Sequence, residues 1–181
     1  MKTKICSFLD QVSGWLKNRD IHNAYSSANI FCEDSIDVDA AGFVSAVLER
    51  ANAADALREL SEFQAGKTEE PRVTSIVYRD FFDALASGSI TSEYWKTVRL
   101  RELEEGDIFL YATADDTDGE HMLFIRQALS PDTFDVMHSV PEMGVRPDRM
   151  TVSKTENGTL LSFDTGVEHT AEKITVGRVC A

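Results

Sequence analysis

The most informative stretch of the chain is Ile36-Asp37-Val38-Asp39-Ala40-Ala41-Gly42-Phe43-Val44-Ser45-Ala46-Val47-Leu48. Asp39 is suited to begin a helix, because its carboxylate can accept from the free backbone N–H groups of the first turn. Apolar residues then recur at helical spacing at positions 40, 43, 44 and 47, which predicts a helix with one face in a core. Position 40 would stand on the first turn of this helix, where the positive end of the helix dipole favours negative charge. A cysteine there would therefore be shifted toward its ionised thiolate form. Alanine has nothing to ionise, so the chain as written is predicted to perform no cysteine-based covalent catalysis.

The rest of the chain divides into a helical half and a strand half. Helical patterns cover residues 5–17, 40–50, 53–63 and 77–86, with a polar connector over 18–37. From Gly106 onward apolar residues alternate with a period of two, which predicts strands at 108–112, 121–128, 133–138, 159–163 and 173–179. Pro131-Asp132 and Glu156-Asn157-Gly158 are turn signals between strands. This order favours an α+β domain in which N-terminal helices pack on an antiparallel sheet.

Residues 39–43 resemble the Asp-Cys-Ser-Gly-Phe signature of NlpC-type papain-like cysteine peptidases and amidases, many of which cut peptide bonds in bacterial cell wall. Asp39, Gly42 and Phe43 match this signature, whereas Ala40 replaces its cysteine and Ala41 its serine or other small residue. Four segments resemble later parts of the family pattern in the same order: residues 103–111, 119–125, 135–139 and 173–179. The resemblance covers roughly residues 25–180 and implies a papain-like (NlpC-type) fold, with 1–181 as a single domain.

The resemblance also implies roles for individual residues. In a form with cysteine at position 40, His121 would act as base and then acid, and His138 would orient His121. Tyr25, Asp39 and Ala41 would lie along the substrate cleft. Each assignment has a plainer alternative: a strand-start His121 with its own partner, a His138 that faces water, and a core or surface Tyr25. The spacing of the histidines does not require zinc, so we expect neither a metal nor another cofactor.

The predicted function of the cysteine form is hydrolysis of an amide bond, most directly in bacterial cell-wall peptide. Deamidation or acyl transfer, as in an effector, is an alternative use of the same nucleophile. Ala40 is either an engineered replacement that silences an active enzyme or the mark of a natural pseudoenzyme that binds a peptide or protein through the same cleft. The presence of both His121 and His138 favours the engineered replacement, and Ala41 weakens that inference. A third possibility is an intracellular structural or immunity-type protein.

Composition argues against nucleic acid, membrane insertion and a calcium loop. The chain has 181 residues and a net charge of −13, which disfavours nucleic acid. No apolar run approaches the ~20 residues that cross a bilayer, so no membrane insertion is expected. The acidic run at 115–118 lacks the remaining ligands of a calcium loop and is predicted to be a hairpin tip.

The N-terminus and the cysteines bear on localisation. The first residues are basic, but Asp10 interrupts the apolar stretch, so residues 5–17 are predicted to form an amphipathic helix rather than a signal peptide. Cys6, Cys32 and Cys180 are odd in number and lack metal-type spacing, which favours free thiols in a reducing compartment. We therefore expect a cytoplasmic protein, or one exported without a cleavable signal peptide, such as a secretion-system effector.

Overall fold

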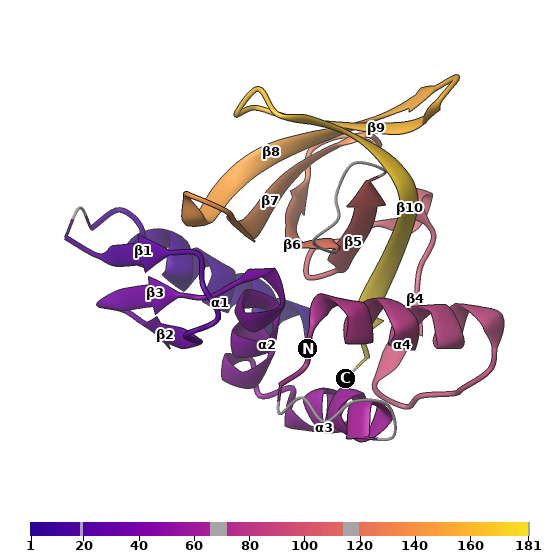
Figure 1. The fold of residues 1–181 in the computed structure, drawn as a ribbon, viewed down its shortest axis with the longest axis horizontal. Helices are drawn as coiled ribbons and strands as arrows, with labels where there is room; N and C mark the ends of the chain where they lie inside the picture. Colours follow the sequence, from indigo (N-terminus) through magenta and orange to yellow (C-terminus); the bar gives the residue numbers. More distant parts are fainter. Residues whose placement is uncertain (19, 66–71, 114–119, 181) are drawn as a thin grey trace.

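A computed structural model describes residues 1–18, 20–65, 72–113 and 120–180 of the chain (Figure 1). Its four α-helices are α1 (Lys2–Trp15), α2 (Ala40–Arg50), α3 (Ala54–Ala65) and α4 (Ser75–Ser87). Each overlaps a helical pattern in the sequence, and α2 has the predicted bounds. The acidic run at 115–118 lies outside the described residues. Among the described residues, no helix is long and apolar enough to cross a bilayer.

Ten strands and a 3-10 turn complete the described chain. A small sheet has the order β1-β3-β2, from β1 (His22–Ala24), β2 (Ile30–Cys32) and β3 (Ser35–Asp37). A large sheet has the order β4-β10-β5-β6-β7-β8-β9, and η1 (Leu100–Glu102) follows β4. Its strands are β4 (Trp95–Thr97), β5 (Ile108–Thr113), β6 (His121–Ala128), β7 (Thr133–Val140), β8 (Gly144–Thr155), β9 (Gly158–Phe163) and β10 (Glu168–Val179).

The large sheet closes on itself, and this closure corrects the predicted fold. The first part of β10 pairs antiparallel with β9, from Glu168 opposite Ser162 to Ala171 opposite Thr159. The later part pairs antiparallel with β5, and the register shifts between Ala171 and Lys173. Such a bulge bends a strand and increases its twist, which lets β10 belong to both neighbours. Strands β5 to β10 therefore form a closed six-stranded antiparallel barrel. The α+β content was predicted correctly, but the papain-like arrangement of helices on a sheet was wrong.

The pleat of the barrel strands separates two hydrophobic cores. Successive side chains of a strand point to opposite faces. On β6, Met122 and Phe124 pack with α2 in the core between the helices and the outside of the barrel, whereas Leu123 and Ile125 pack inside the barrel. Figure 1 shows the helices gathered at one side of the barrel, away from β9. The barrel interior is thus a compartment separate from the helix layer.

Local hydrogen bonds explain why α2 begins at residue 40. The side chain of Asp39 accepts from the backbone N–H of Gly42 at 2.7 Å, as the sequence predicts for an N-cap. Its second oxygen pairs with Arg72. The helix packs against β6 and β7, and the Ser139 hydroxyl of β7 donates to the Val38 carbonyl at 2.7 Å. Cap and strand together fix the position of the helix start.

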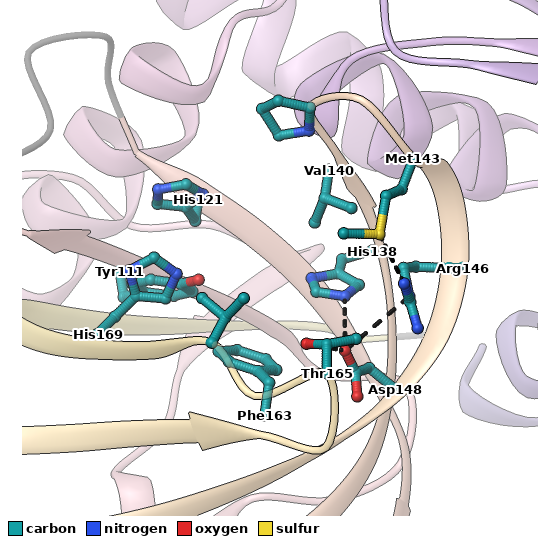
Figure 2. A pocket seen from close by; sticks show the side chains of 12 residues that line it. Tyr111, His121, His138, Val140, Met143, Arg146, Asp148, Phe163, Thr165 and His169 are labelled. Carbon is teal, nitrogen blue, oxygen red and sulfur yellow. Dashed lines mark hydrogen bonds and ion pairs between the residues drawn. The ribbon is translucent and has the colours of Figure 1, made fainter.

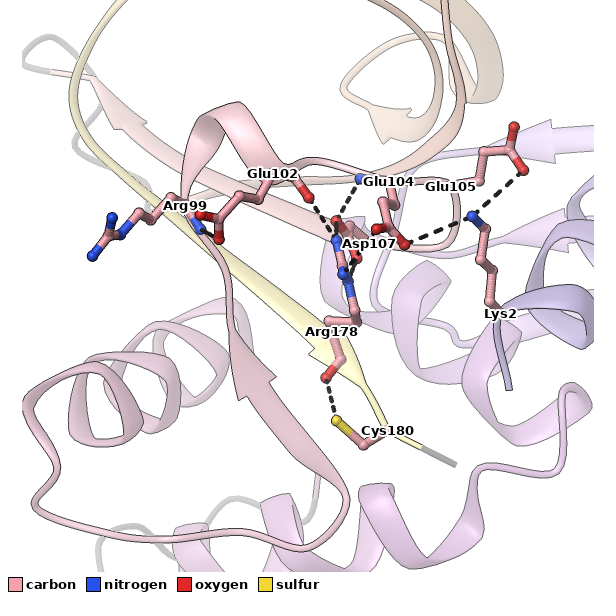
Figure 3. Close-up of polar contacts among 8 residues, drawn as sticks. All are labelled: Lys2, Arg99, Glu102, Glu104, Glu105, Asp107, Arg178 and Cys180. Carbon is pink, nitrogen blue, oxygen red and sulfur yellow. Dashed lines mark hydrogen bonds and ion pairs between the residues drawn. The ribbon is translucent and has the colours of Figure 1, made fainter. Parts of the chain in front are cut away.

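A buried ion pair ties the end of β10 to the start of β5 (Figure 3). Arg178 donates from Nε to Oδ1 of Asp107 at 2.6 Å and from a terminal nitrogen to Oδ2 at 2.8 Å. The Asp107 side chain is 1% exposed, and it also accepts from the backbone N–H of Glu104 at 2.8 Å. This fork-shaped pair is the strong form of an arginine–carboxylate contact. It anchors the strand that closes the barrel.

Asn23 helps to join the small sheet to the barrel. Asn23 of β1 accepts from the backbone N–H of Val145 and donates to its carbonyl, both at 2.8 Å. Gly144 has φ of +66°, and a Cβ there would come within 2.4 Å of Oδ1 of Asn23. The start of β8 therefore requires glycine for both its conformation and its close approach to β1.

Candidate functional site

A pocket of about 250 Å³ opens at one end of the barrel (Figure 2). Its lining comes from strands β5 to β10 and from the turns after β7 and β9. Two apolar side chains in this lining are unusually exposed: Met143 at 48% and Val167 at 41%. The lining residues are Tyr111, His121, His138, Val140, Pro141, Met143, Arg146, Asp148, Phe163, Thr165, Val167 and His169.

Aromatic and imidazole rings form the walls of this barrel-mouth pocket. The His121 ring stacks on Tyr111 with centroids 4.9 Å apart and planes 17° apart. His169 lies 5.2 Å from His121 between centroids. Phe163 stacks on His138 at 5.5 Å, again with an angle of 17°. Tyr111 and Phe163 are almost completely buried, so the walls are held by the core behind them. The walls are thus built from flat, mainly apolar surfaces.

Polar groups from two neighbouring strands meet at the base of the pocket. His138 lies opposite Arg146 in the β7–β8 register, and Asp148 lies two residues further along β8. Nε2 of His138 is 3.7 Å from Oδ2 of Asp148, and Nε of Arg146 is 4.0 Å from the same oxygen. Thr165 donates to this oxygen at 3.1 Å. The Asp148 side chain is only 2% exposed, so its charge is compensated by these neighbours.

Burial keeps His138 neutral at ordinary pH. Desolvation is the largest effect and, with the nearby charges of Arg146 and His121, lowers the pKa of His138 to about 4, although Asp148 acts in the opposite direction. The residue is 7% exposed, which agrees with a dominant desolvation effect. His138 therefore enters the pocket base as an uncharged imidazole, with one nitrogen as donor and the other as acceptor.

The structure brings some of the sequence-predicted site residues together and separates others. His121 and His138 both line the barrel-mouth pocket. Ala40 belongs to the helix-facing core and is 7% exposed, and neither it nor Asp39 nor Ala41 is among the lining residues. Because Met122 faces that core, the pleat directs the neighbouring His121 to the barrel interior. The start of α2 and the two histidines therefore lie on different faces of the strands between them.

Tyr25 lies outside the pocket, whereas three residues that the sequence analysis did not select line it. Tyr25 is 39% exposed and follows β1, outside the pocket lining. Arg146 and Asp148 were missed because β8 was not predicted. His169, which lies outside the segments that resemble the family pattern, lines the pocket from β10. The alternation of Arg146, Asp148 and Met150 along one face of β8 was the signal available in the sequence.

The described residues contain no group of three or more His, Cys, Asp or Glu side chains arranged to hold a metal ion. Comparison with protein-family models, with curated proteins and with solved structures finds no match. The resemblance of residues 39–43 to the NlpC-type signature therefore remains a prediction.

Proposed function

We propose that this chain is a binding protein, and that its barrel-mouth pocket holds a planar ring of a small molecule or of a peptide side chain. The observation that carries the proposal is the ring-walled pocket with polar groups at its base. Binding sites for small ligands are typically apolar concavities with a few convergent polar groups. A volume of about 250 Å³ suits a single ring rather than a large cofactor.

The walls favour a flat ligand over a flexible aliphatic one. Aromatic pairs gain about 0.5–1.5 kcal/mol beyond the area they bury when rings stack with an offset or meet edge to face. Tyr111 and His121 already stack on each other, and the His169 ring makes tilted contacts with both. A further ring at the mouth would extend this arrangement and cover the exposed side chains of Met143 and Val167.

Binding is favoured over hydrolysis by the placement of position 40. Cysteine hydrolases need a thiolate and an imidazole within hydrogen-bond reach of each other. Here Ala40 packs between helix and sheet, whereas His121 points into the barrel and stacks on Tyr111. We therefore retain the alternative that the sequence offered, a protein that binds a ligand without catalysis, and place its binding site at the barrel mouth rather than at the start of α2.

A titration with toluene tests the proposal. In protein labelled with ¹³C and ¹⁵N in histidine, we expect the ring signals of His121 and His169 to shift with a dissociation constant on the order of 1 mM, which is about 4 kcal/mol. The exposed His22 serves as an internal reference. Histidine signals that stay unchanged at saturating toluene would remove the proposal.

Two variants localise the binding. Val167 and Leu129 are equally exposed apolar residues, at 41% and 42%, but only Val167 lines the pocket. Val167→Glu places a charge at the mouth and is expected to weaken toluene binding severalfold. Leu129→Glu, in the turn between β6 and β7, is expected to leave binding unchanged. Equal effects of the two substitutions would place the binding elsewhere.

A further inference from the structure

Two nitrogen atoms at the base of the barrel-mouth pocket are buried without a hydrogen-bond partner within the described part of the chain: Nε2 of His138 and Nε of Arg146. Both lie near Oδ2 of Asp148, at 3.7 Å and 4.0 Å, which is beyond hydrogen-bond length. Figure 2 shows these three side chains converging on one point. Buried polar groups are normally satisfied, and a separation longer than 3.5 Å between polar atoms leaves room for a further group to bridge them.

The charges around this gap define what fits there. Nε of Arg146 is always a donor. Because Nε2 of His138 faces a carboxylate, the favoured form of the neutral imidazole carries its proton on Nε2, which makes this nitrogen a donor too. Asp148 supplies an acceptor. A group at the centre must therefore accept from one or both nitrogens and donate to the oxygen. A hydroxyl does both, because it carries one O–H donor and two acceptor lone pairs.

Charged groups fit less well. A carboxylate would accept from both nitrogens but would face Asp148, whose side chain is 2% exposed and poorly screened. An ammonium group would pair with Asp148 but would face Arg146. Like charges in a desolvated site disfavour each other, so the base selects a neutral group.

We infer that the ligand of the barrel-mouth pocket is a phenol, its ring between the aromatic walls and its hydroxyl among His138, Arg146 and Asp148. This inference rests on the proposed function and adds the chemical class of the ligand. The phenol is either a free small molecule or a tyrosine side chain of a peptide. Both present the same ring and hydroxyl to the pocket.

The test compares p-cresol with toluene, which differs from it only by the hydroxyl. Isothermal titration of the full chain at pH 7 is expected to show p-cresol binding about tenfold more tightly, as one net hydrogen bond to charged groups provides. In Arg146→Met, which removes one of the two donors proposed to hold the hydroxyl, the preference for p-cresol over toluene is expected to fall severalfold. Arg149→Met, at a neighbouring exposed position of β8, is the matched control and is expected to keep the tenfold preference.

The outcomes separate this inference from the proposed function. Equal affinity for p-cresol and toluene overturns the phenol assignment but leaves a ring-binding pocket. Tighter binding of 4-methylbenzoate or 4-methylbenzylamine than of p-cresol also overturns it, because the base would then select a charge. Failure of every ring to bind overturns the proposed function as well. N-acetyl-tyrosine methylamide distinguishes the two sources: tighter binding than p-cresol supports a peptide ligand, and weaker binding supports a free phenol.

Discussion

Nε2 of His138 lies 3.7 Å from Oδ2 of Asp148, next to the apolar core inside the barrel. The two residues come from neighbouring strands and both have almost fully buried side chains, 9% and 2% exposed. A buried histidine and a buried carboxylate are expensive to maintain unless they contribute to stability or binding. Their position at the base of a ring-walled pocket supports the proposed role in binding.

The burial of His138 predicts a dependence of stability on pH. Its pKa is about 4 in the folded protein and near 6.5 when unfolded, so between these values the unfolded chain binds the extra proton. Stability contributed by neutral His138 is complete above pH 6.5 and is lost as the pH falls toward 4, by about 3 kcal/mol in all. Urea unfolding at pH 7 and pH 4.5 measures this loss. In His138→Gln the loss should be smaller by about that amount, whereas His22→Gln should behave as the parent. A His138→Gln protein with the parental pH dependence would contradict the burial effect.

The contact between α4 and β10 predicts a severe effect at one glycine. A Cβ added at Gly177 would stand 2.0 Å from Cζ of Phe82, a residue in the core between helices and barrel. Gly177→Ala is therefore expected to destabilise the fold by about 2 kcal/mol or more, as overpacked cores are. Chemical unfolding measures the change, and adding Phe82→Leu should restore part of it. Gly14→Ala is the control: nothing lies within 4 Å of that Cβ, and alanine in helix α1 should stabilise by about 0.5–1 kcal/mol. A fully stable Gly177→Ala protein would be inconsistent with this packing.

The buried pair at the end of β10 predicts another large effect. Asp107→Asn removes the buried partner of Arg178 and leaves it the half-exposed Glu104, at 3.4 Å, as a charge partner, so the expected loss of stability is about 3 kcal/mol, as for a broken buried pair. Lys2→Gln removes pairs whose side chains are about half exposed, so it should cost less than about 0.5 kcal/mol. Thermal and urea unfolding of both variants check the contrast. Comparable losses would argue against the role of Asp107 in anchoring the barrel.

The fold could be predicted from the sequence wherever the signal was local. Helix α2 has the predicted bounds because Asp39 caps it and the apolar residues of one face follow within eleven positions. The turns before β7 and β9 were predicted from Pro131-Asp132 and Asn157-Gly158 for the same reason. Strands of three residues, such as β1 and β4, carry too few alternations to be recognised.

Closure of the barrel could not be predicted, because it depends on pairing between residues far apart in the sequence and on segments with weak local patterns. The bulge at residues 171–173 that lets β10 pair with both β5 and β9 has no distinctive local pattern. Strand β8 was missed because its outer face is exposed and polar, and because Pro147 argues against a central strand. The site was predicted only in part for the same reason. His121 and His138 were selected, but Asp148 and Arg146 lie on the missed strand.

The placement of position 40 predicts the outcome of restoring a nucleophile there. Ala40→Cys is expected to fold and to release no fragments from purified peptidoglycan, because His121 points to the other face of β6. Mass spectrometry of the digest, with the Ala40 protein as the blank, checks this. Burial of the side chain to 7% also predicts slow reaction with a thiol reagent. Fragments from the cysteine form alone would restore the amidase predicted from the sequence.

The most direct test of the binding account is to locate a bound ring by intermolecular nuclear Overhauser effects. The protein is labelled at alanine, valine and methionine methyl groups and saturated with p-cresol. The account predicts contacts from the p-cresol ring to the methyl groups of Met143 and Val167, at the mouth of the barrel. Contacts to the methyl groups of Ala40 and Ala41 instead would place the binding site at the start of α2 and contradict the account.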